Sequence, residues 1–374
     1  MSSIERARLQ ALARHSVGVI RAHQATTGAY VASPAFPVYG FSWFRDGAFI
    51  ADAMSRAGDI ESAEAFFEWC AGILVSRRER VASLIERHEA GQPIEPTEHL
   101  HARYTVDGVE SGDDWANFQL DGYGTWLWAL GAHAVRHGRS IAAFAEGAAV
   151  STQYIAAFWE APCYDWWEEN PEHQHTSTLA ALHAGLRAAA GWEDLPDQLR
   201  SSATDAADVI RDTVLADTRR LGRLAKWLGG DAVDGSLLAC ATPFGLLDPA
   251  DPLMAATVRA IELDLAHQGG VHRYAADTYY GGGEWLLLAG FLGLQYLATG
   301  RINDARTDLD WLAAHATPGG DLPEQVDDHL LAPSARAAWL GRWGPVATPL
   351  LWSHAMYLTL ALELGVVDAP VDVP

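Results

Sequence analysis

The stretch Tyr164-Asp165-Trp166-Trp167-Glu168-Glu169-Asn170 joins two adjacent tryptophans to two adjacent carboxylates near the middle of the chain. Apolar residues recur at helical spacing on both sides of it, over about residues 140–159 and 176–190. The stretch is therefore predicted to be a loop between two helices. The same alternation of helix and aromatic loop continues along the chain in both directions, which favours an all-α fold.

About twelve helices are predicted, and strand-like alternation is scarce. Besides the two already named, they lie at about residues 3–24, before Gly58, after the capping residue Asp59, before Leu130, and at about 195–215, 236–241, 251–267, 284–299, 302–315 and 351–364. No strong internal repeat marks a solenoid. Helices that alternate with long aromatic loops suggest a closed helical toroid, with the loops and the chemistry gathered at one end.

Length and charge narrow the classes of protein. No Gly/Ser-rich or Pro-rich linker divides the 374 residues, so residues 1–374 are expected to form a single domain. The net charge of −22 and the pI near 4.9 repel phosphate backbones and anionic membrane surfaces. Nucleic acid and membranes are therefore not expected as partners, whereas a neutral sugar is unaffected by this charge. The oligomeric state is not readable from the sequence.

The cysteines and the N-terminus favour the cytoplasm. Cys70, Cys163 and Cys240 lie far apart, without the paired spacing of a zinc site, and their odd number cannot be fully bridged. The first residues lack the apolar run of a signal peptide, and no later run reaches transmembrane length. The sequence predicts a cytoplasmic protein that needs no cofactor and no metal.

The central stretch is suited to glycosidic bond cleavage. An indole ring covers the apolar face of a sugar, and a carboxylic acid in a site of low polarity stays protonated and donates its proton. Glu168 is the candidate acid, and we expect Trp166 and Trp167 to desolvate it. The candidate for the second carboxylate is Glu324, 156 residues away (324 − 168), which must stay ionised and therefore needs hydrogen-bond donors and access to water.

Six elements in order resemble glycoside hydrolase family 15, the glucoamylase family. The first, Tyr39-Gly40-Phe41-Ser42-Trp43-Phe44-Arg45-Asp46, is similar to the "Y-x-x-x-W-x-R-D" element of that family. The others are Trp115–Gly122, Trp167–Glu169 (the "W-E-E" element), Arg273–Trp285, Pro323–Gln325 and Leu351–Ala355. The resemblance spans residues 39 to 355, and its strength lies in the number and order of the elements.

The resemblance implies an (α/α)6 barrel and exo-acting, inverting hydrolysis that releases β-glucose from a non-reducing end. It makes Glu168 the general acid and Glu324 the general base. It also implies a set of substrate-binding residues: Arg45, Asp46 and Arg273 for the hydroxyls of the terminal glucose, Tyr39 beneath its ring, Trp43, Trp115, Trp167 and Trp285 as pocket walls, and Glu169 for the next sugar. Ala276 departs from the family, since fungal members tend to carry a glutamate there, so recognition beyond the first sugar is not implied.

Relatives cleave α-1,4 bonds of starch, α-1,6 bonds of isomaltose and dextran-like chains, or trehalose. This chain has neither a β-sandwich domain before the barrel nor a starch-binding module after it, which favours short oligosaccharides. We therefore expect α-1,6-linked glucosides as in compact bacterial isomaltose glucohydrolases, with malto-oligosaccharides and trehalose as alternatives.

Other interpretations remain open. A sugar epimerase on a similar helical toroid needs catalytic histidines, for which His173, His175 and His272 are the candidates. A catalytically silent carbohydrate-binding or scaffolding protein is a further alternative. The pair His173 and His175 is also the most metal-like pattern in the chain, but the spacing supplies no third ligand. The run Gly281-Gly282-Gly283 lacks the strand and lysine of a phosphate loop and is interpreted as close loop packing.

Overall fold

The structure, a computed structural model, describes residues 2–371. Its α-helices are α1 (Ser3–Ala22), α2 (Phe44–Arg56), α3 (Ile60–Ser76), α4 (Arg78–Glu89), α5 (Asp121–His137), α6 (Ala145–Phe158), α7 (Thr176–Ala190), α8 (Asp197–Thr218), α9 (Pro252–Asp264), α10 (Leu286–Ala298), α11 (Ile302–Ala314), α12 (Arg336–Trp343) and α13 (Leu351–Glu363). The prediction of an all-α fold is confirmed.

The strands are two residues long and form three separate antiparallel pairs. They are β1 (Ser42–Trp43) with β2 (Arg103–Tyr104), β3 (Ala266–His267) with β4 (Gly270–Val271), and β5 (Glu284–Trp285) with β6 (Gln325–Val326). Gln268 and Gly269, which join β3 to β4, both have positive φ, as a tight two-residue hairpin requires. These pairs fasten loops to one another and form no extended sheet.

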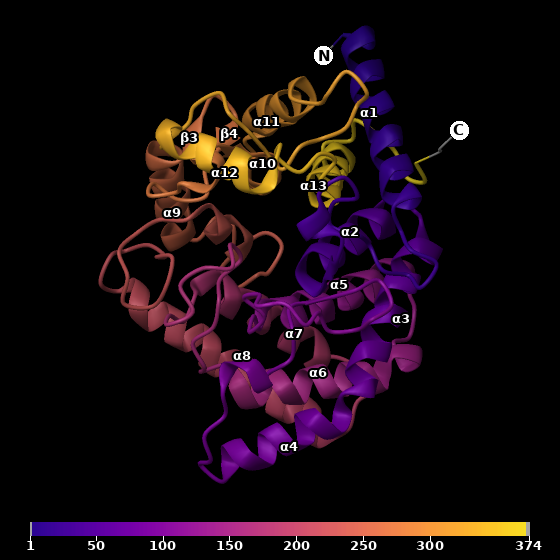
Figure 1. The fold of residues 1–374 in the computed structure, drawn as a ribbon, viewed down its shortest axis with the longest axis vertical. Helices are drawn as coiled ribbons and strands as arrows, with labels where there is room; N and C mark the ends of the chain where they lie inside the picture. The colour runs from indigo at the N-terminus through magenta and orange to yellow at the C-terminus, as the bar shows by residue number, and fades with distance from the viewer. Residues whose placement is uncertain (1, 372–374) are drawn as a thin grey trace.

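An inner ring of helices surrounds the centre of the molecule. In ring order it consists of α2, α5, α7, the 3-10 helix η4 (Gly235–Cys240), α10 and α13, and α13 returns to contact α2 (Figure 1). Residues on every side of α10 and α13 are buried. Such all-round burial is expected of a helix enclosed by others.

An outer layer covers the ring. Helices α3, α6, α8, α9, α11 and α1 pack against members of the inner ring, which completes an (α/α)6 barrel. The outer helix α8 buries a single stripe, Ala203, Ala207, Ile210, Val214 and Thr218, at intervals of three and four residues. This spacing is that of an amphipathic helix with one face toward the core. Helix α4 packs on α6, outside the two layers.

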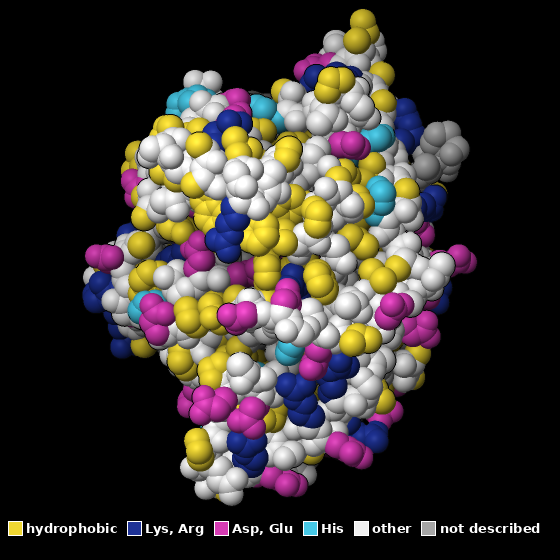
Figure 2. Space-filling view, viewed as in Figure 1, with side chains coloured by type: hydrophobic (Ala, Val, Ile, Leu, Met, Phe, Trp, Pro, Cys, Tyr) yellow, Lys and Arg dark blue, Asp and Glu magenta, His cyan; other side chains and the backbone are white. Residues whose placement is uncertain are grey.

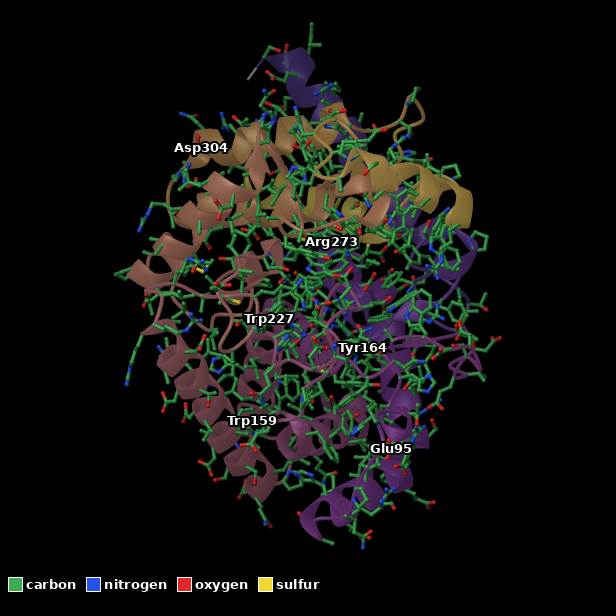
Figure 3. All side chains as sticks on the ribbon, turned by 60° about the vertical axis from the view of Figure 1, so that its left-hand side comes forward. Glu95, Trp159, Tyr164, Trp227, Arg273 and Asp304 are labelled. Carbon is green, nitrogen blue, oxygen red and sulfur yellow. The ribbon has the colours of Figure 1, made fainter. Side chains whose placement is uncertain are left out.

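The two ends of the barrel carry connections of different length. The segments that enter the inner ring are long, at residues 23–43, 90–120, 159–175, 219–234, 265–285 and 315–350. The segments that leave it are shorter, at residues 57–59, 138–144, 191–196, 241–251 and 299–301. In Figure 3, Arg273 from one of the long segments lies toward the middle of the molecule, whereas Asp304 of α11 lies at its edge.

The predicted helices match the structure closely, but α4 and α12 are not among them. Asp59 caps α3 as predicted, accepting a hydrogen bond from the Ser62 amide. Helix α12 was not predicted, because its eight residues contain no buried position that would produce an apolar pattern. Among residues 2–371, no helix is both long and apolar enough to cross a membrane.

Candidate active site

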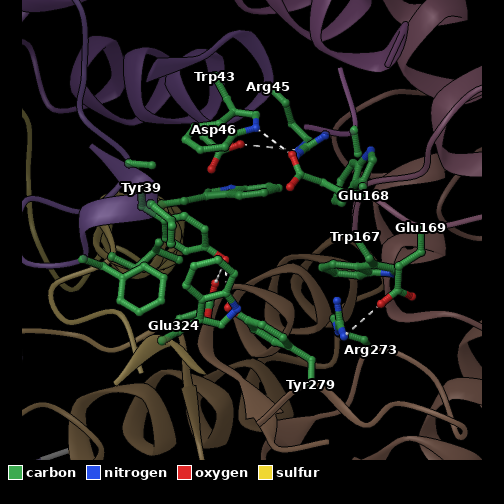
Figure 4. Close-up of a pocket in the computed structure, with 18 of the residues that line it drawn as sticks. Tyr39, Trp43, Arg45, Asp46, Trp167, Glu168, Glu169, Arg273, Tyr279 and Glu324 are labelled. Carbon is green, nitrogen blue, oxygen red and sulfur yellow. Dashed lines mark hydrogen bonds and ion pairs between the residues drawn. The ribbon is translucent and has the colours of Figure 1, made fainter. Parts of the chain in front are cut away.

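A cavity of about 330 Å³ lies at the end of the barrel where the long segments gather. Figure 2 shows hydrophobic side chains around a hollow below α12, with acidic and basic side chains inside it. The residues predicted for the site all line this cavity (Figure 4). They are Tyr39, Trp43, Arg45, Asp46, Trp115, Trp167, Glu168, Glu169, Arg273, Trp285 and Glu324. They come from five of the six long segments and from the start of α2.

The loop that carries Glu168 is a tight turn held by Asp165. One carboxylate oxygen of Asp165 accepts hydrogen bonds from the amides of Trp167 and Glu169, each at 2.9 Å. Glu168 itself has φ of 65°, a left-handed conformation that is uncommon for a residue with a side chain. Such strain persists only where the surroundings enforce it, and it is typical of functional positions.

A buried lysine braces this turn from the segment 219–234. The Lys226 ammonium lies 3.2 Å from Asp165 and 3.1 Å from Asp234, and Asp234 also accepts a hydrogen bond from the Trp167 indole at 2.9 Å. Burial acts to lower the pKa of Lys226, but the two carboxylates outweigh it and the pKa is raised. The ammonium group and its two carboxylate partners thus hold both the backbone of the turn and the ring of Trp167 in place.

The described residues fix one oxygen of the Glu168 carboxylate. Oε1 accepts hydrogen bonds from the Trp43 indole at 2.8 Å and from the Gln119 amide at 3.0 Å. Within residues 2–371, Oε2 has no hydrogen-bond partner. The carboxyl group is thus oriented through one atom while the other is left to interact with a ligand.

Glu324 shows the same arrangement on the opposite side of the cavity (Figure 4). Its Oε1 accepts a hydrogen bond from the Tyr39 hydroxyl at 3.0 Å, and Tyr39 in turn lies 3.0 Å from the Tyr279 hydroxyl. Its Oε2 is buried and has no partner among the described residues. Burial raises the pKa of Glu324 to about 7, against the opposing effects of the Tyr39 hydroxyl and the Arg273 guanidinium.

The burial of the two carboxylates is the reverse of what the sequence predicts, which is a desolvated Glu168 and a Glu324 with access to water. Glu324 is 2% exposed, whereas Glu168 is half-buried, so the candidate base is the more desolvated of the pair. Glu168, which Trp166 and Trp167 are expected to remove from water, stays half-buried, and its Oε1 accepts a hydrogen bond from the Trp43 indole. Glu324 is deeper because it directly precedes β6, which is paired with β5.

Arg45 and Asp46 lie in the first turn of α2, the first inner helix. The Arg45 guanidinium donates to Gln119 at 2.7 Å and to Asp121 at 3.0 Å, and lies 3.4 Å from Asp46. Burial raises the pKa of Asp46 to about 6, although Arg45 acts to lower it. One oxygen of Asp46 is buried without a hydrogen-bond partner in the described chain, which leaves it available to a polar ligand.

Arg273 lies among aromatic rings at the other side of the cavity (Figure 4). It forms a bidentate pair with Asp277, at 2.8 and 2.6 Å, and its Nη2 lies 3.5 Å from Glu169. Its guanidinium carbon lies 5.3 Å from the centroid of Trp167 and 5.2 Å from that of Trp285. Glu169 therefore points toward Arg273 while Glu168 points toward Trp43, so the two adjacent glutamates serve different parts of the cavity.

The tryptophans form the cavity wall in two pairs. Trp43 and Trp115 meet edge to face, with centroids 6.2 Å apart, and Trp167 and Trp285 lie 5.4 Å apart. The guanidinium of Arg103 lies 3.6 Å from the centroid of Trp115 and supports that ring from behind. Fixed indole faces beside charged groups form a surface that suits a sugar ring.

Several lining residues were missed by reasoning from the sequence. Trp339, Arg342 and Trp343 come from the unpredicted helix α12, and Trp339 lies 4.9 Å from Tyr279 by ring centroids. The network residue Lys226 was also missed, since a single lysine in a loop produces no pattern. Tyr279 stood within a matching motif, and its position beside Arg273 and Trp285 was the only signal for it.

The histidines considered for other functions do not line the cavity. His173 stacks on Trp227 at 4.2 Å, His175 bonds to the carbonyl of Asn170, and His272 lies within hydrogen-bond distance of the carbonyls of Gly282 and Gly283. None of the three is placed for proton transfer to a ligand in the cavity. A side chain at Gly283 would collide with the carbonyl of Val326, which confirms close packing of the glycine run.

The family is shown by a direct match. The model of Glycosyl hydrolases family 15 matches residues 6–306. The chain belongs to glycosyl hydrolase family 15. The resemblance to this family is thus confirmed, and four of its six elements lie within the matched residues.

Individual known proteins are similar to this chain over almost its whole length. The isomaltose glucohydrolase of Kribbella flavida is 49% identical over 98% of this chain and 95% of its own length. A solved glycosidase variant in complex with glucose is 48% identical, with a TM-score of 0.96 over 98% of this chain and all of the other. The glucoamylase of Saccharomycopsis fibuligera shares the fold, with a TM-score of 0.74 at 13% identity over 96% of this chain and 94% of its own.

Proposed function

We propose that this chain hydrolyses the α-glucosidic bond at the non-reducing end of short α-glucosides with inversion, releasing β-D-glucose. One observation carries the proposal. Glu168 and Glu324 face one tryptophan-walled cavity from opposite sides, and each has one oxygen held by the protein and one free. Inverting hydrolysis needs this pair, an acid for the leaving group and a base for water on the other face of the sugar.

Glu168 is the proposed general acid. The indole of Trp43 and the amide of Gln119 bond to Oε1, so the proton resides on Oε2, where it is directed at the glycosidic oxygen. The sugar that binds between the indole rings covers the half-buried carboxyl, and this desolvation favours its protonated form. The proton moves to the leaving oxygen as the bond to the anomeric carbon breaks.

Glu324 is the proposed general base. The Tyr39 hydroxyl fixes Oε1, and the free Oε2 accepts a proton from the attacking water. With a pKa raised to about 7, the carboxylate is a stronger base than an exposed glutamate, and it is predominantly ionised only above neutral pH. Burial therefore makes the Glu324 carboxylate a stronger base. It also lowers the fraction of Glu324 that is ionised below neutral pH.

The other lining residues are proposed to hold the terminal glucose. Arg45, Asp46 and Arg273 offer charged hydrogen-bond partners to its hydroxyls, and the Asp46 oxygen beside Arg45 has no hydrogen-bond partner among the described residues. Tyr39, Trp43, Trp115, Trp167 and Trp285 provide its aromatic surroundings, and Glu169 is proposed to contact the next sugar. The cavity ends at Trp352, which stacks on Phe49 in the barrel centre at 5.0 Å. A closed end suits the terminus of a sugar chain.

Isomaltose and short isomalto-oligosaccharides are the proposed substrates. Support comes from the similarity to the isomaltose glucohydrolase of Kribbella flavida over 98% of this chain. Maltose with other malto-oligosaccharides and trehalose are the alternatives, since the same two carboxylates serve each linkage. We propose that residues 1–374 act as one catalytic domain without a cofactor, in the cytoplasm and without a nucleic-acid partner. The burial of all three cysteines as free thiols agrees with a reducing compartment.

Initial rates on isomaltose, maltose and trehalose test the substrate proposal. We expect kcat/KM for isomaltose to exceed the other two by at least about tenfold, since one misplaced polar contact costs that much. The Glu168→Gln variant, purified in parallel, serves as the control for contaminating glycosidases. A higher kcat/KM for maltose or trehalose than for isomaltose would overturn the choice of substrate while leaving the two-carboxylate mechanism in place.

A further inference from the structure

Three side chains of the metal-ligating kind meet beside the cavity, outside the wall of the candidate active site. His267 ends β3, Glu284 begins β5, and His329 lies in the loop after β6. One ligand atom from each lies within 4.8 Å of the other two. Because the three come from separate segments, the cluster is a product of the fold. It is independent of the pair His173 and His175 that the sequence pattern indicated.

Glu284 is the residue that makes this cluster unusual. Its side chain is fully buried, and Oε1 contacts the Nδ1 of His329 at 3.1 Å. Its Oε2 is buried and has no hydrogen-bond partner in the described part of the chain. A buried carboxylate with an unpaired oxygen is costly unless a cation or further donors compensate its charge. Among the described residues, no lysine or arginine contacts this carboxylate.

The backbone around Glu284 is shaped to accept its carboxylate. A Cβ atom at Gly270 would come within 2.6 Å of Oε2 and 2.4 Å of the carboxyl carbon. Only a glycine at this position of β4 therefore leaves room for the group. The side of the cluster formed by His267 and His329 is exposed, and their rings lie 3.8 Å apart by centroids. Histidine side chains also reach the molecular surface in the region of β3 (Figures 1 and 2).

We propose that His267, Glu284 and His329 bind one divalent transition-metal ion of the zinc type. Two imidazole nitrogens and one carboxylate oxygen are ligands that Zn²⁺ prefers, whereas Ca²⁺ and Mg²⁺ prefer oxygen alone. Zinc–ligand bonds are about 2.0–2.2 Å long, so the ligand atoms must approach to within about 3.5 Å of one another. Because the rings of His267 and His329 are exposed, rotation of these side chains can bring the ligand atoms to that separation. Water then completes the coordination on the open side.

The ion fastens the strands that carry part of the active site. Glu284 adjoins Trp285 in β5, and β5 is paired with β6, which begins directly after Glu324. A metal bound to Glu284 links β5 to the β3–β4 hairpin through His267 and to the loop after β6 through His329. The site is therefore structural, and it stabilises the positions of Trp285 and Glu324 without contacting a ligand in the cavity.

Zinc binding to the untagged, chelator-treated protein tests the site. Titration calorimetry with ZnCl₂ should give one ion per chain, and zinc should raise the thermal midpoint by several degrees, since a ligand bound only by the folded state stabilises it. His267→Ala and His329→Ala should each weaken the affinity at least about tenfold. Both residues are exposed, so these variants are expected to fold.

His173→Ala is the matched control, because His173 is similarly exposed and also lies beside a carboxylate, that of Glu172 at 3.5 Å. It should bind zinc as the unaltered chain does. Glu284→Gln supplies a second readout: its thermal midpoint without metal should be at least that of the unaltered protein, and zinc should no longer raise it. The proposal is overturned by the absence of saturable binding, by equal affinity for Mg²⁺ or Ca²⁺, or by an equal loss in His173→Ala.

Discussion

The two ends of the barrel both contain a cavity, yet only one has the chemistry of an active site. The cavity at the opposite end has about 410 Å³, against about 330 Å³ for the candidate active site. Its buried acidic residue, Asp52, has both oxygens occupied, by Arg56 and Arg136 at 2.7 Å each. Glu168 and Glu324 each keep one oxygen free. Cavity volume thus does not distinguish the two ends. They differ in whether both oxygens of the lining carboxylates named here have partners within the protein.

The lengths of the connections explain the difference. The long segments at the active-site end bring polar side chains from distant parts of the chain into one hollow. At the opposite end the connections are shorter, and the residues of α2, α10 and α13 line the cavity directly. Side chains on adjacent helices pair with their neighbours, while side chains on long loops can be left unpaired for a ligand. Phe49 and Trp352 stack between the two cavities and separate them.

The largest expected effect is on turnover. Removing a carboxylate from the candidate active site should abolish it, whereas removing one from the opposite cavity should not. Glu324→Gln and Glu168→Gln should each lower kcat on isomaltose by at least about 10²–10⁴-fold, the contribution of general acid–base catalysis, and leave substrate binding largely intact. Glu363→Gln removes a carboxylate from the opposite cavity, where Glu363 is partly exposed and paired with Arg56, and should leave kcat unchanged. Near-normal turnover in either pocket variant would contradict the assignment of roles.

A second expected effect is an opposite change in stability at the two ends. Burial acts to raise the pKa of Asp52, but Arg56 and Arg136 outweigh it and the pKa is lowered, so its ion pairs stabilise the fold above about pH 4 and this stability is lost below. Asp52→Asn should therefore lower the free energy of unfolding at pH 8, by the order of 2 kcal/mol.

Glu324 has the reverse linkage. Its pKa is raised from 4.5 to about 7, so the folded state keeps a proton that the unfolded state releases, and stability falls as the pH rises from about 4 through 7. Glu324→Gln should raise the free energy of unfolding at pH 8, by up to about 3 kcal/mol, and show little gain at pH 4. Chemical denaturation of both variants at these pH values measures the contrast, and a loss of stability in Glu324→Gln at pH 8 would be the wrong sign.

The smallest expected effect is a dependence of kcat/KM on pH. If Glu324 is the base, kcat/KM should rise with pH through an apparent pKa near 7, since only the ionised form accepts the proton of water. Activity that falls with pH through the same pKa would make Glu324 the acid and reverse the two roles. Rates on isomaltose between pH 5 and 9 decide between these outcomes.

Much of the molecule could be predicted from the sequence, because helical periodicity and the order of aromatic loop motifs are local signals. They located most helices, the loop-bearing end, and the residues that the structure gathers in one cavity. The bracing of the Glu168 turn by Lys226 could not be predicted, since Lys226 lies 58 residues after Glu168 (226 − 168) in a loop without a pattern. Helix α12 could not be predicted, because its Trp339 packs on Tyr279 and Tyr280 and the helix has no regular apolar face. The greater burial of Glu324 arises from strand pairing that two-residue strands do not reveal in advance.

The measurement that tests the central claim most directly is the configuration of the first glucose released. Proton NMR of isomaltose hydrolysis by the purified chain, recorded before mutarotation is complete, resolves the two anomers. Water activated by Glu324 on the face opposite the bond that Glu168 protonates must give β-glucose first. Initial release of α-glucose would contradict a two-carboxylate inverting mechanism in this pocket.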